Sequence, residues 1–352
     1  MRANGGVDDA VMVHRIATAS GRSQAALLCR EAQDCALARH DAAMLKDQPP
    51  MDTGHVSYST IALAGRASDP RVTEAMLALA RHLLERGRAL RAVAGTGIDF
   101  GPLPVELVPE PELALGADLM VAVGGDGTML HAARMAAMAD VPVLGINRGR
   151  LGFLADVGPE QMVQSLDDAL GGRCQAERRM LLAAHILADG QPIDALALND
   201  VVVAKRETGR MVDVRTWVNG AYVNTHVGDG FIIATPTGST AYALSCGGPI
   251  LHPSLDAVVL VPVCPHTLSD RPIVVPAGAV VEIELADRFE SRAQVVCDGI
   301  VLCDLDPGVR LRVERARVSA TLLHPPGHDY YRILRSKLHW GRGTREGQPP
   351  GA

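Results

Sequence analysis

The segment from Leu119 to Ile146 constrains the fold most, because its pattern predicts a strand, a glycine turn, a helix and a second strand. The apolar run 119–123 leads into Gly-Gly-Asp-Gly, helix formers follow at 129–139, and a second apolar run covers 141–146. Two strands joined through a helix pair in parallel. In such a unit the turn after the first strand lies at the carboxyl edge of the sheet, where ligands bind. We therefore predict an α/β domain with a ligand site at this turn.

The chemistry of the turn favours a phosphate. Gly124, Gly125 and Gly127 allow the backbone to approach a ligand closely, and the helix begins at Thr128. Bare N–H groups at a helix N-terminus attract anions. Asp126 would repel a phosphate, so its predicted role is to bind a divalent cation or to accept a proton from an attacking hydroxyl. The alternative is that Asp126 only caps the helix.

From about Arg178 the pattern changes from alternating helices and strands to short strands alone. Turn signals such as Ala-Asp-Gly, Val-Asn-Gly and Asp-Pro-Gly separate these strands, one of which is predicted from Ala195 to Lys205. Many short strands without intervening helices are typical of an antiparallel sandwich. The expected fold class is an α/β, Rossmann-like N-terminal domain at 58–177 followed by an all-β, sandwich-like C-terminal domain at 178–325.

Two end segments lie outside these domains. Residues 1–57 are expected to be a mobile extension, or the product of a start codon called too early with Met51 as the true start. Residues 326–352 are expected to contain a closing helix, Tyr330–Leu338, and a tail. The apolar side chains of this helix need cover, so we predict that it packs back on the first domain.

Composition excludes several classes of function. The net charge is −6 with no long basic stripe, which argues against a nucleic-acid partner. No run of 18 apolar residues is present, so no transmembrane helix is expected. The 7 cysteines are odd in number and form no C-x-x-C, so neither a disulfide framework nor a zinc site is indicated, and the metal ligands stay unassigned. Reduced thiols favour a cytoplasmic location.

Two motifs in the second domain carry chemistry. Asn199 and Asp200 place polar groups in an apolar strand; an amide can pair with the N6/N7 edge of adenine, and a carboxylate suits ribose hydroxyls. The alternative is an Asn-Asp turn. Residues 228–249 crowd hydroxyls, small residues and Tyr242 around a strand-to-helix turn, with room for a helical turn at 240–245. No G-x-S-x-G is present, so a serine hydrolase is not indicated.

In this combination and order the motifs resemble the NAD kinase family in its proteobacterial form. The resemblance covers about Ile61 to Trp340. It rests on Gly-Gly-Asp-Gly-Thr, Asn-Arg-Gly-x-Leu-Gly-Phe-Leu, Asn-Asp-Val-Val-Val, Asp-Gly-Phe-Ile-Ile-Ala-Thr-Pro-Thr-Gly-Ser-Thr-Ala-Tyr and Leu-x-x-Lys-Leu-x-Trp. Gly-Gly-Asp-Gly alone is shared with lipid kinases and phosphofructokinases, whereas the Thr-Pro-Thr-Gly-Ser-Thr-Ala-Tyr run is far more specific.

The resemblance implies transfer of the terminal phosphoryl group of ATP, or of polyphosphate, to the adenosine 2′-hydroxyl of NAD, with Mg²⁺ or Mn²⁺. It implies Asp126 as the catalytic base, Tyr242 stacked on adenine, Asp229 at the nicotinamide half, and a homodimer or homotetramer. The nucleotide-binding residues that it implies are Gly124, Gly125, Gly127, Thr128, Phe153, Asn199, Asp200, Arg210, Asp229, Ala234, Thr240, Ala241, Tyr242, Ala243, Leu244 and Ser245.

The chain departs from the family pattern at three positions. Arg150 replaces a usual Asn, Val227 a usual Arg or Lys, and Ile300 a common Gln. The last two lie in the dinucleotide pocket of relatives, so weaker NAD binding or a changed preference between NAD and NADH is implied. Two alternatives to an active NAD kinase therefore stay open: a non-catalytic nucleotide-binding paralogue with a regulatory role, and a kinase of another substrate such as a lipid or sugar phosphate.

Overall fold

The computed structural model describes residues 58–340 except 68, 150–151, 189, 207–209 and 287–291. The expectations for residues 1–57, for the tail after Trp340 and for Arg150 lie outside the described residues. None of the helices in the described part of the chain is long and apolar enough to cross a membrane.

The first part of the chain forms a parallel sheet with the strand order β5-β4-β1-β2-β3. The predicted parallel pairing of the first two strands is confirmed, with Val121 opposite Leu144. The carboxyl ends of β4 and β5 therefore lie next to each other at one edge of the sheet. The strands are β1 (Thr60–Ala64), β2 (Ala89–Val93), β3 (Val105–Val108), β4 (Leu119–Gly124) and β5 (Val143–Asn147).

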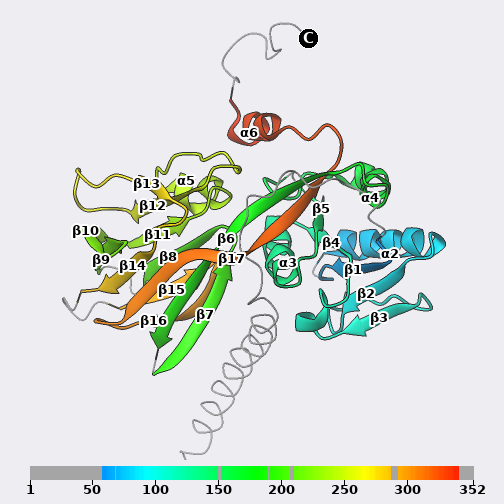
Figure 1. Cartoon of the computed structure of the whole chain (residues 1–352). Helices are drawn as coiled ribbons and strands as arrows, with labels where there is room; N and C mark the ends of the chain where they lie inside the picture. The colour runs from blue at the N-terminus through cyan, green and yellow to red at the C-terminus, as the bar shows by residue number, and fades with distance from the viewer. Residues whose placement is uncertain are drawn as a thin grey trace, which may run out of the picture. The chain divides into compact units, whose positions relative to one another are not determined.

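Helices cover both faces of this sheet (Figure 1). Alternate strand residues point to opposite faces. Accordingly Leu63 and Val121 join a core cluster with residues of α2 (Pro70–Glu85) and α4 (Met162–Leu170). Their neighbours Ala62 and Met120 join a different cluster with α3 (Asp126–Met138). The short 3-10 helices η1 (Glu110–Glu112) and η2 (Pro159–Gln161) precede β4 and α4.

The second part is built from antiparallel strands in two sheets. One sheet has the order β13-β12-β11-β8-β15-β16, and the other strands join the sheet of the first part. A shared apolar cluster contains residues of both, such as Val203 and Phe231 from one and Val214 and Ile283 from the other. This arrangement confirms the sandwich-like expectation. The strands are β6 (Gln175–Ala188), β7 (Gln191–Ala197), β8 (Asp200–Lys205), β9 (Val212–Val218), β10 (Ala221–Gly228), β11 (Gly230–Ala234), β12 (Ala257–Val263), β13 (Ile273–Pro276), β14 (Val281–Leu285), β15 (Ala293–Cys297), β16 (Ile300–Leu305) and β17 (Arg310–His324).

The long strand β17 joins the two parts. It pairs antiparallel with β6 and β14, and its end pairs parallel with β5 at Leu322 and Leu323. One 11-stranded sheet therefore runs from the parallel part into the antiparallel part. The sequence did not predict this continuity, because the pairing joins residues about 180 positions apart.

The prediction of a single strand from Ala195 to Lys205 is wrong. The structure divides it into β7 and β8, with Leu198 and Asn199 between them. The N–H groups of Leu198 and Asn199 donate to the carboxylate of Asp298. A distant side chain thus interrupts a segment whose apolar pattern is continuous.

The closing helix α6 (Tyr330–Leu338) begins at Asp329, whose carboxylate accepts the N–H groups of Tyr331 and Arg332 as an N-cap. Its side chains Ile333 and Leu334 are buried. The helix contacts the first domain, where the Lys337 ammonium lies 5.8 Å from the ring centroid of Phe153. It also reaches the β-rich part through His252.

Candidate active site

Asp126 is the first residue of α3, directly after the Gly-Gly turn that ends β4. The helix cap is Gly125, and no side-chain cap bond forms, so the helix-cap alternative for Asp126 is wrong. Instead, Asp126 Oδ2 accepts the N–H of Phe153 at 2.9 Å, and Oδ1 accepts those of Leu154 and Ala155 at 3.2 and 3.3 Å. These bonds come from the loop after β5, so the carboxylate is held at the carboxyl edge of the sheet. A carboxylate offers about four lone-pair positions, and three are used.

Gly152 permits this geometry. A Cβ atom built on Gly152 would lie 1.8 Å from Asp126 Oδ1 and 2.6 Å from its Cγ. No side chain fits at such distances. The sequence motif Leu-Gly-Phe-Leu therefore has glycine here because the Asp126 carboxylate occupies the space that any Cβ needs.

If Asp126 is catalytic, Gly152→Ala is expected to lower turnover on the order of 100-fold, because the methyl group must displace the Asp126 carboxylate, and a displacement of about 1 Å has effects of that size. Gly158→Ala is the matched control, since it lies in the same connection with nothing within 4 Å of its built Cβ. Steady-state rates and unfolding curves of both variants check this. Equal turnover of the two variants would contradict the assigned position of Asp126.

Asn199 and Asp200 lie where β7 passes into β8, and Asp298 holds this junction. The side chain of Asp298 is fully buried, and its carboxylate accepts the N–H groups of Leu198, Asn199 and Asp200 at 2.9, 2.8 and 3.1 Å. It also forms an ion pair with Arg134 of α3 at 2.8 Å. The Asn199 Oδ1 atom is buried without a hydrogen-bond partner. Because a buried acceptor without a donor is costly, this oxygen fits a donor supplied by a ligand.

Burial and the nearby Asp298 carboxylate raise the pKa of Asp200 to about 7. The residue is 6% exposed, so water does little to stabilise the charge of its carboxylate. Near neutral pH the Asp200 side chain is therefore present partly as the protonated acid and partly as the carboxylate. It can offer a ligand either an O–H donor or an acceptor.

This pKa predicts that the folded state loses stability as the pH rises. Between pH 4 and 7 the unfolded chain releases the Asp200 proton while the folded chain keeps it, so stability falls with increasing pH in that window. At about 1.4 kcal/mol per pH unit, the change from pH 5 to 7 is about 2 to 3 kcal/mol. Asp200→Asn should remove this contribution. Urea unfolding of both proteins at pH 5 and pH 7.5 tests it, and identical pH dependence of the two would refute it.

The turn after β11 packs on the Asn199 junction. Ala234 pairs with Asp200 across the sheet, and the N–H of Thr235 donates to the carbonyl of Asn199 at 2.8 Å. The hydroxyls of Thr235 and Ser239 are buried and bonded to backbone groups, so they hold the turn rather than face a ligand. Gly238 packs against this junction so closely that a Cβ atom built on it would lie 2.1 Å from the backbone carbonyl oxygen of Asn199.

The helical turn expected at 240–245 is present as η3 (Gly238–Thr240) and α5 (Tyr242–Ser245). Tyr242 is 45% exposed, so part of its side chain is accessible to a ligand. Asp229 precedes β11, and its carboxylate forms an ion pair with Lys205 at 2.5 Å. Ala243 is buried, and Thr240, Ala241 and Leu244 are half-buried.

Two contacts connect the Asp126 group with the Asn199 group. Arg134 lies two turns along α3 from Asp126, and its guanidinium donates to the Asp298 carboxylate. The same carboxylate accepts the N–H of Asn199. On the other side, Lys337 of α6 approaches Phe153, and Tyr330 of the same helix donates to the carbonyl of Leu251 at 3.4 Å. The N–H of Leu251 in turn donates to the Ser239 hydroxyl. The predicted groups thus belong to one connected region.

Some residues of this region were absent from the sequence prediction. Asp298 and Arg134 were not expected, although the Asp-Gly turn at 298–299 was a signal for a hairpin.

The remaining residues named from the sequence lie at or near the surface. Arg210 is exposed just before β9, at the edge of the described segment. Val227 is half-buried on β10 and Ile300 is 51% exposed on β16.

Comparison with known families covers both the α/β part with its Gly-Gly-Asp-Gly turn and the β-rich part. The family described as ATP-NAD kinase N-terminal domain matches residues 105–174, and the ATP-NAD kinase C-terminal domain matches residues 198–324.

Curated relatives agree. The NAD kinase of Methylococcus capsulatus is 44% identical over 284 residues, 80% of this chain and 98% of the relative, and that of Nitrosococcus oceani is 43% identical over 286 residues, 81% and 98%. The chain belongs to the NAD kinase family.

Solved structures share the fold. A yeast NADH kinase complexed with NADH aligns with a TM-score of 0.76 at 24% identity, over 83% of this chain and 90% of that one. An NAD kinase from Archaeoglobus fulgidus in complex with ATP aligns with a TM-score of 0.61 at 28% identity, over 80% and 98%.

Proposed function

We propose that this protein phosphorylates NAD to NADP, transferring the terminal phosphoryl group of ATP to the adenosine 2′-hydroxyl. The observation that carries the proposal is the Asp126 carboxylate, held by three backbone N–H groups beside a glycine turn at a helix N-terminus. Phosphoryl transfer needs alignment and charge neutralisation more than covalent participation. A fixed carboxylate next to a phosphate-binding turn meets both needs.

Asp126 accepts the proton of the 2′-hydroxyl as that oxygen attacks the terminal phosphorus of ATP. The bond from this phosphorus to the bridging oxygen breaks, and ADP leaves. The backbone N–H groups of Gly124–Thr128 hold the phosphates of the donor. Mg²⁺ or Mn²⁺, when bound, would neutralise charge on the phosphates of the donor. The remaining lone-pair position of Asp126 is the one that accepts the proton.

The β-rich part positions NAD. The unpartnered Asn199 Oδ1 fits the N6 amino group of adenine, and the exposed ring of Tyr242 fits stacking on the base. Asp200 suits ribose hydroxyls, and the Lys205–Asp229 pair suits the nicotinamide half. Phe153, Arg210, Ala234 and residues 240–245 complete the proposed binding set.

The direct test is an assay of NADP formation from NAD, ATP and Mg²⁺, with NADH and polyphosphate as the alternative acceptor and donor. We expect NADP, with the phosphate on the adenosine 2′-oxygen by phosphorus NMR. NAD binding by calorimetry without any product would support the regulatory paralogue, for which Val227 and Ile300 are the motivating departures. Phosphorylation of a lipid or sugar phosphate but not of NAD would refute the proposal.

We also propose a cytoplasmic homodimer or homotetramer. The thiols of Cys174, Cys246, Cys264 and Cys297 form no disulfide within the described residues, which fits a reducing compartment. Leu268 is 92% exposed, and Ile273 and Val274 on the edge strand β13 are 39% and 49% exposed, which suits self-association. Sedimentation of the protein at micromolar concentration tests this, and a monomer would contradict it.

A further inference from the structure

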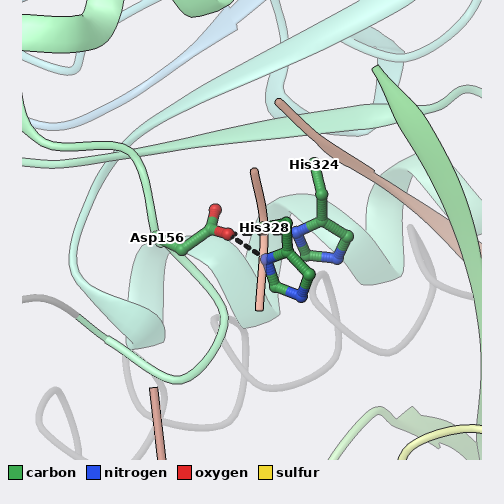
Figure 2. A group of neighbouring side chains, drawn as sticks. All are labelled: Asp156, His324 and His328. Atoms are coloured by element: carbon green, nitrogen blue, oxygen red, sulfur yellow. Dashed lines mark hydrogen bonds and ion pairs between the residues drawn. The ribbon is translucent and has the colours of Figure 1, made fainter. Parts of the chain in front are cut away.

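Three metal-ligating side chains converge outside the nucleotide site (Figure 2). Asp156 follows the loop that binds Asp126, His324 ends β17, and His328 lies just before α6. His328 Nδ1 and His324 Nδ1 lie 2.5 and 3.3 Å from the same oxygen, Asp156 Oδ2. Within the described residues this is the one group of three such side chains whose ligand atoms all lie within 4.8 Å of one another.

A second carboxylate lies behind one of the imidazoles. Glu177 Oε2 is 3.1 Å from His324 Nε2, with the two atoms outside hydrogen-bonding geometry. Glu177 is itself paired with Arg179 at 2.7 Å. Histidines that bind metals usually direct their other ring nitrogen to a carboxylate, which orients the ring and makes it a better ligand. His324 has that second carboxylate in place and is 2% exposed.

With neutral rings, His324 has one N–H between two carboxylates. That N–H faces Asp156 from Nδ1 or Glu177 from Nε2, but not both, whereas a cationic His324 has an N–H on each nitrogen. The rings of His324 and His328 stack at 3.8 Å, so charging both would place two cations face to face. A metal ion bound by both Nδ1 atoms would leave both rings neutral, with the proton of His324 on Nε2, 3.1 Å from the Glu177 carboxylate.

We propose that Asp156, His324 and His328 bind one divalent transition-metal ion of the Zn²⁺ type, with water completing the coordination. A donor set of two imidazoles and one carboxylate binds Zn²⁺ in preference to Mg²⁺. Ligands at about 2.0–2.1 Å from one ion lie at most about 4 Å apart, which small rotations of the rings achieve. Since Ala155 donates to Asp126 and Asp156 follows it directly, the ion ties the Asp126 loop to the start of α6.

The test is Zn²⁺ binding to the full chain after treatment with a chelator, measured by competition with a chromophoric chelator. Cysteines and other histidines can also bind Zn²⁺, so the readout is the difference between variants. His328→Gln should lose one bound ion per chain or bind it at least about 10-fold more weakly. His185→Gln is the matched control, because His185 also faces two carboxylates, Asp194 and Glu314, but at the surface. It should bind like the wild type.

Two further measurements keep the outcome decisive. Zn²⁺ should raise the thermal midpoint of the wild type and of His185→Gln but not that of His328→Gln or Asp156→Asn. Co²⁺ should give the wild type a visible spectrum without thiolate bands. Equal Zn²⁺ binding by wild type and His328→Gln, or a Co²⁺ spectrum from thiolate ligands alone, would overturn the proposal. If neither variant folds, the Co²⁺ spectrum of the wild type decides. Failure here leaves the NADP assay unaffected, because that assay does not depend on this site.

Discussion

Asp126→Asn is expected to lower the turnover for NADP formation by at least about 100-fold, the usual size of effect when a general base is removed. The amide lacks the negative charge and nearly all of the basicity of the carboxylate. NAD binding should change much less, because the Asn199 junction and Tyr242 lie on other elements. Steady-state rates together with calorimetry of NAD binding on the same protein separate the two effects.

The structure adds a second effect of this substitution. Both Asp126 oxygens accept backbone N–H groups, so an amide NH₂ must face at least one donor of the 153–155 loop. We expect a loss of about 1 to 3 kcal/mol in unfolding free energy from that unmatched contact. Asp140→Asn, at an exposed position two residues after the end of the same helix, is the control and should change neither quantity. Near-normal turnover of Asp126→Asn would falsify the catalytic assignment.

Asp298→Asn is expected to lower the free energy of unfolding by about 3 kcal/mol or more, since removing one partner of a buried ion pair typically costs 3 to 5 kcal/mol. The change leaves Arg134 without its charged partner and weakens the support of three backbone N–H groups. Asparagine is chosen because Asp298 has φ of 46°, a conformation that Asn tolerates better than Ala.

The consequences of Asp298→Asn should extend to the ligand site. The Asn199 junction is held by this carboxylate, so NAD affinity should fall together with stability, and the pKa of Asp200 should drop because Asp298 helps to raise it. Asp304→Asn is the control: Asp304 pairs with Arg206 at the surface and should cost less than about 1 kcal/mol. Denaturant unfolding and NAD calorimetry check both. A loss below 1 kcal/mol for Asp298→Asn would contradict the role assigned to the carboxylate.

The sequence by itself determined what depends on neighbouring residues. The strand, turn and helix from Leu119 to Met138 follow from apolar runs and glycines next to one another, and so does the parallel pairing of β4 and β5. The closing helix was predicted at its observed bounds, Tyr330–Leu338, because its periodicity is local. The motif residues Asp126 and Asn199-Asp200 were also singled out from the chain alone, and their roles in binding and catalysis stay predictions.

Only the tertiary structure decided what joins residues far apart in the chain. It showed that Asp126 binds the 153–155 loop instead of capping its helix, and that Asp298 breaks a continuous apolar segment into β7 and β8. Neither contact leaves a local pattern, because each depends on pairing between strands and loops across tens to about a hundred positions. The same holds for Asp156, His324 and His328, which the parallel pairing of β17 with β5 brings to one place. Periodicity reports which face of an element is buried, whereas contacts between distant segments are set by how those faces pack.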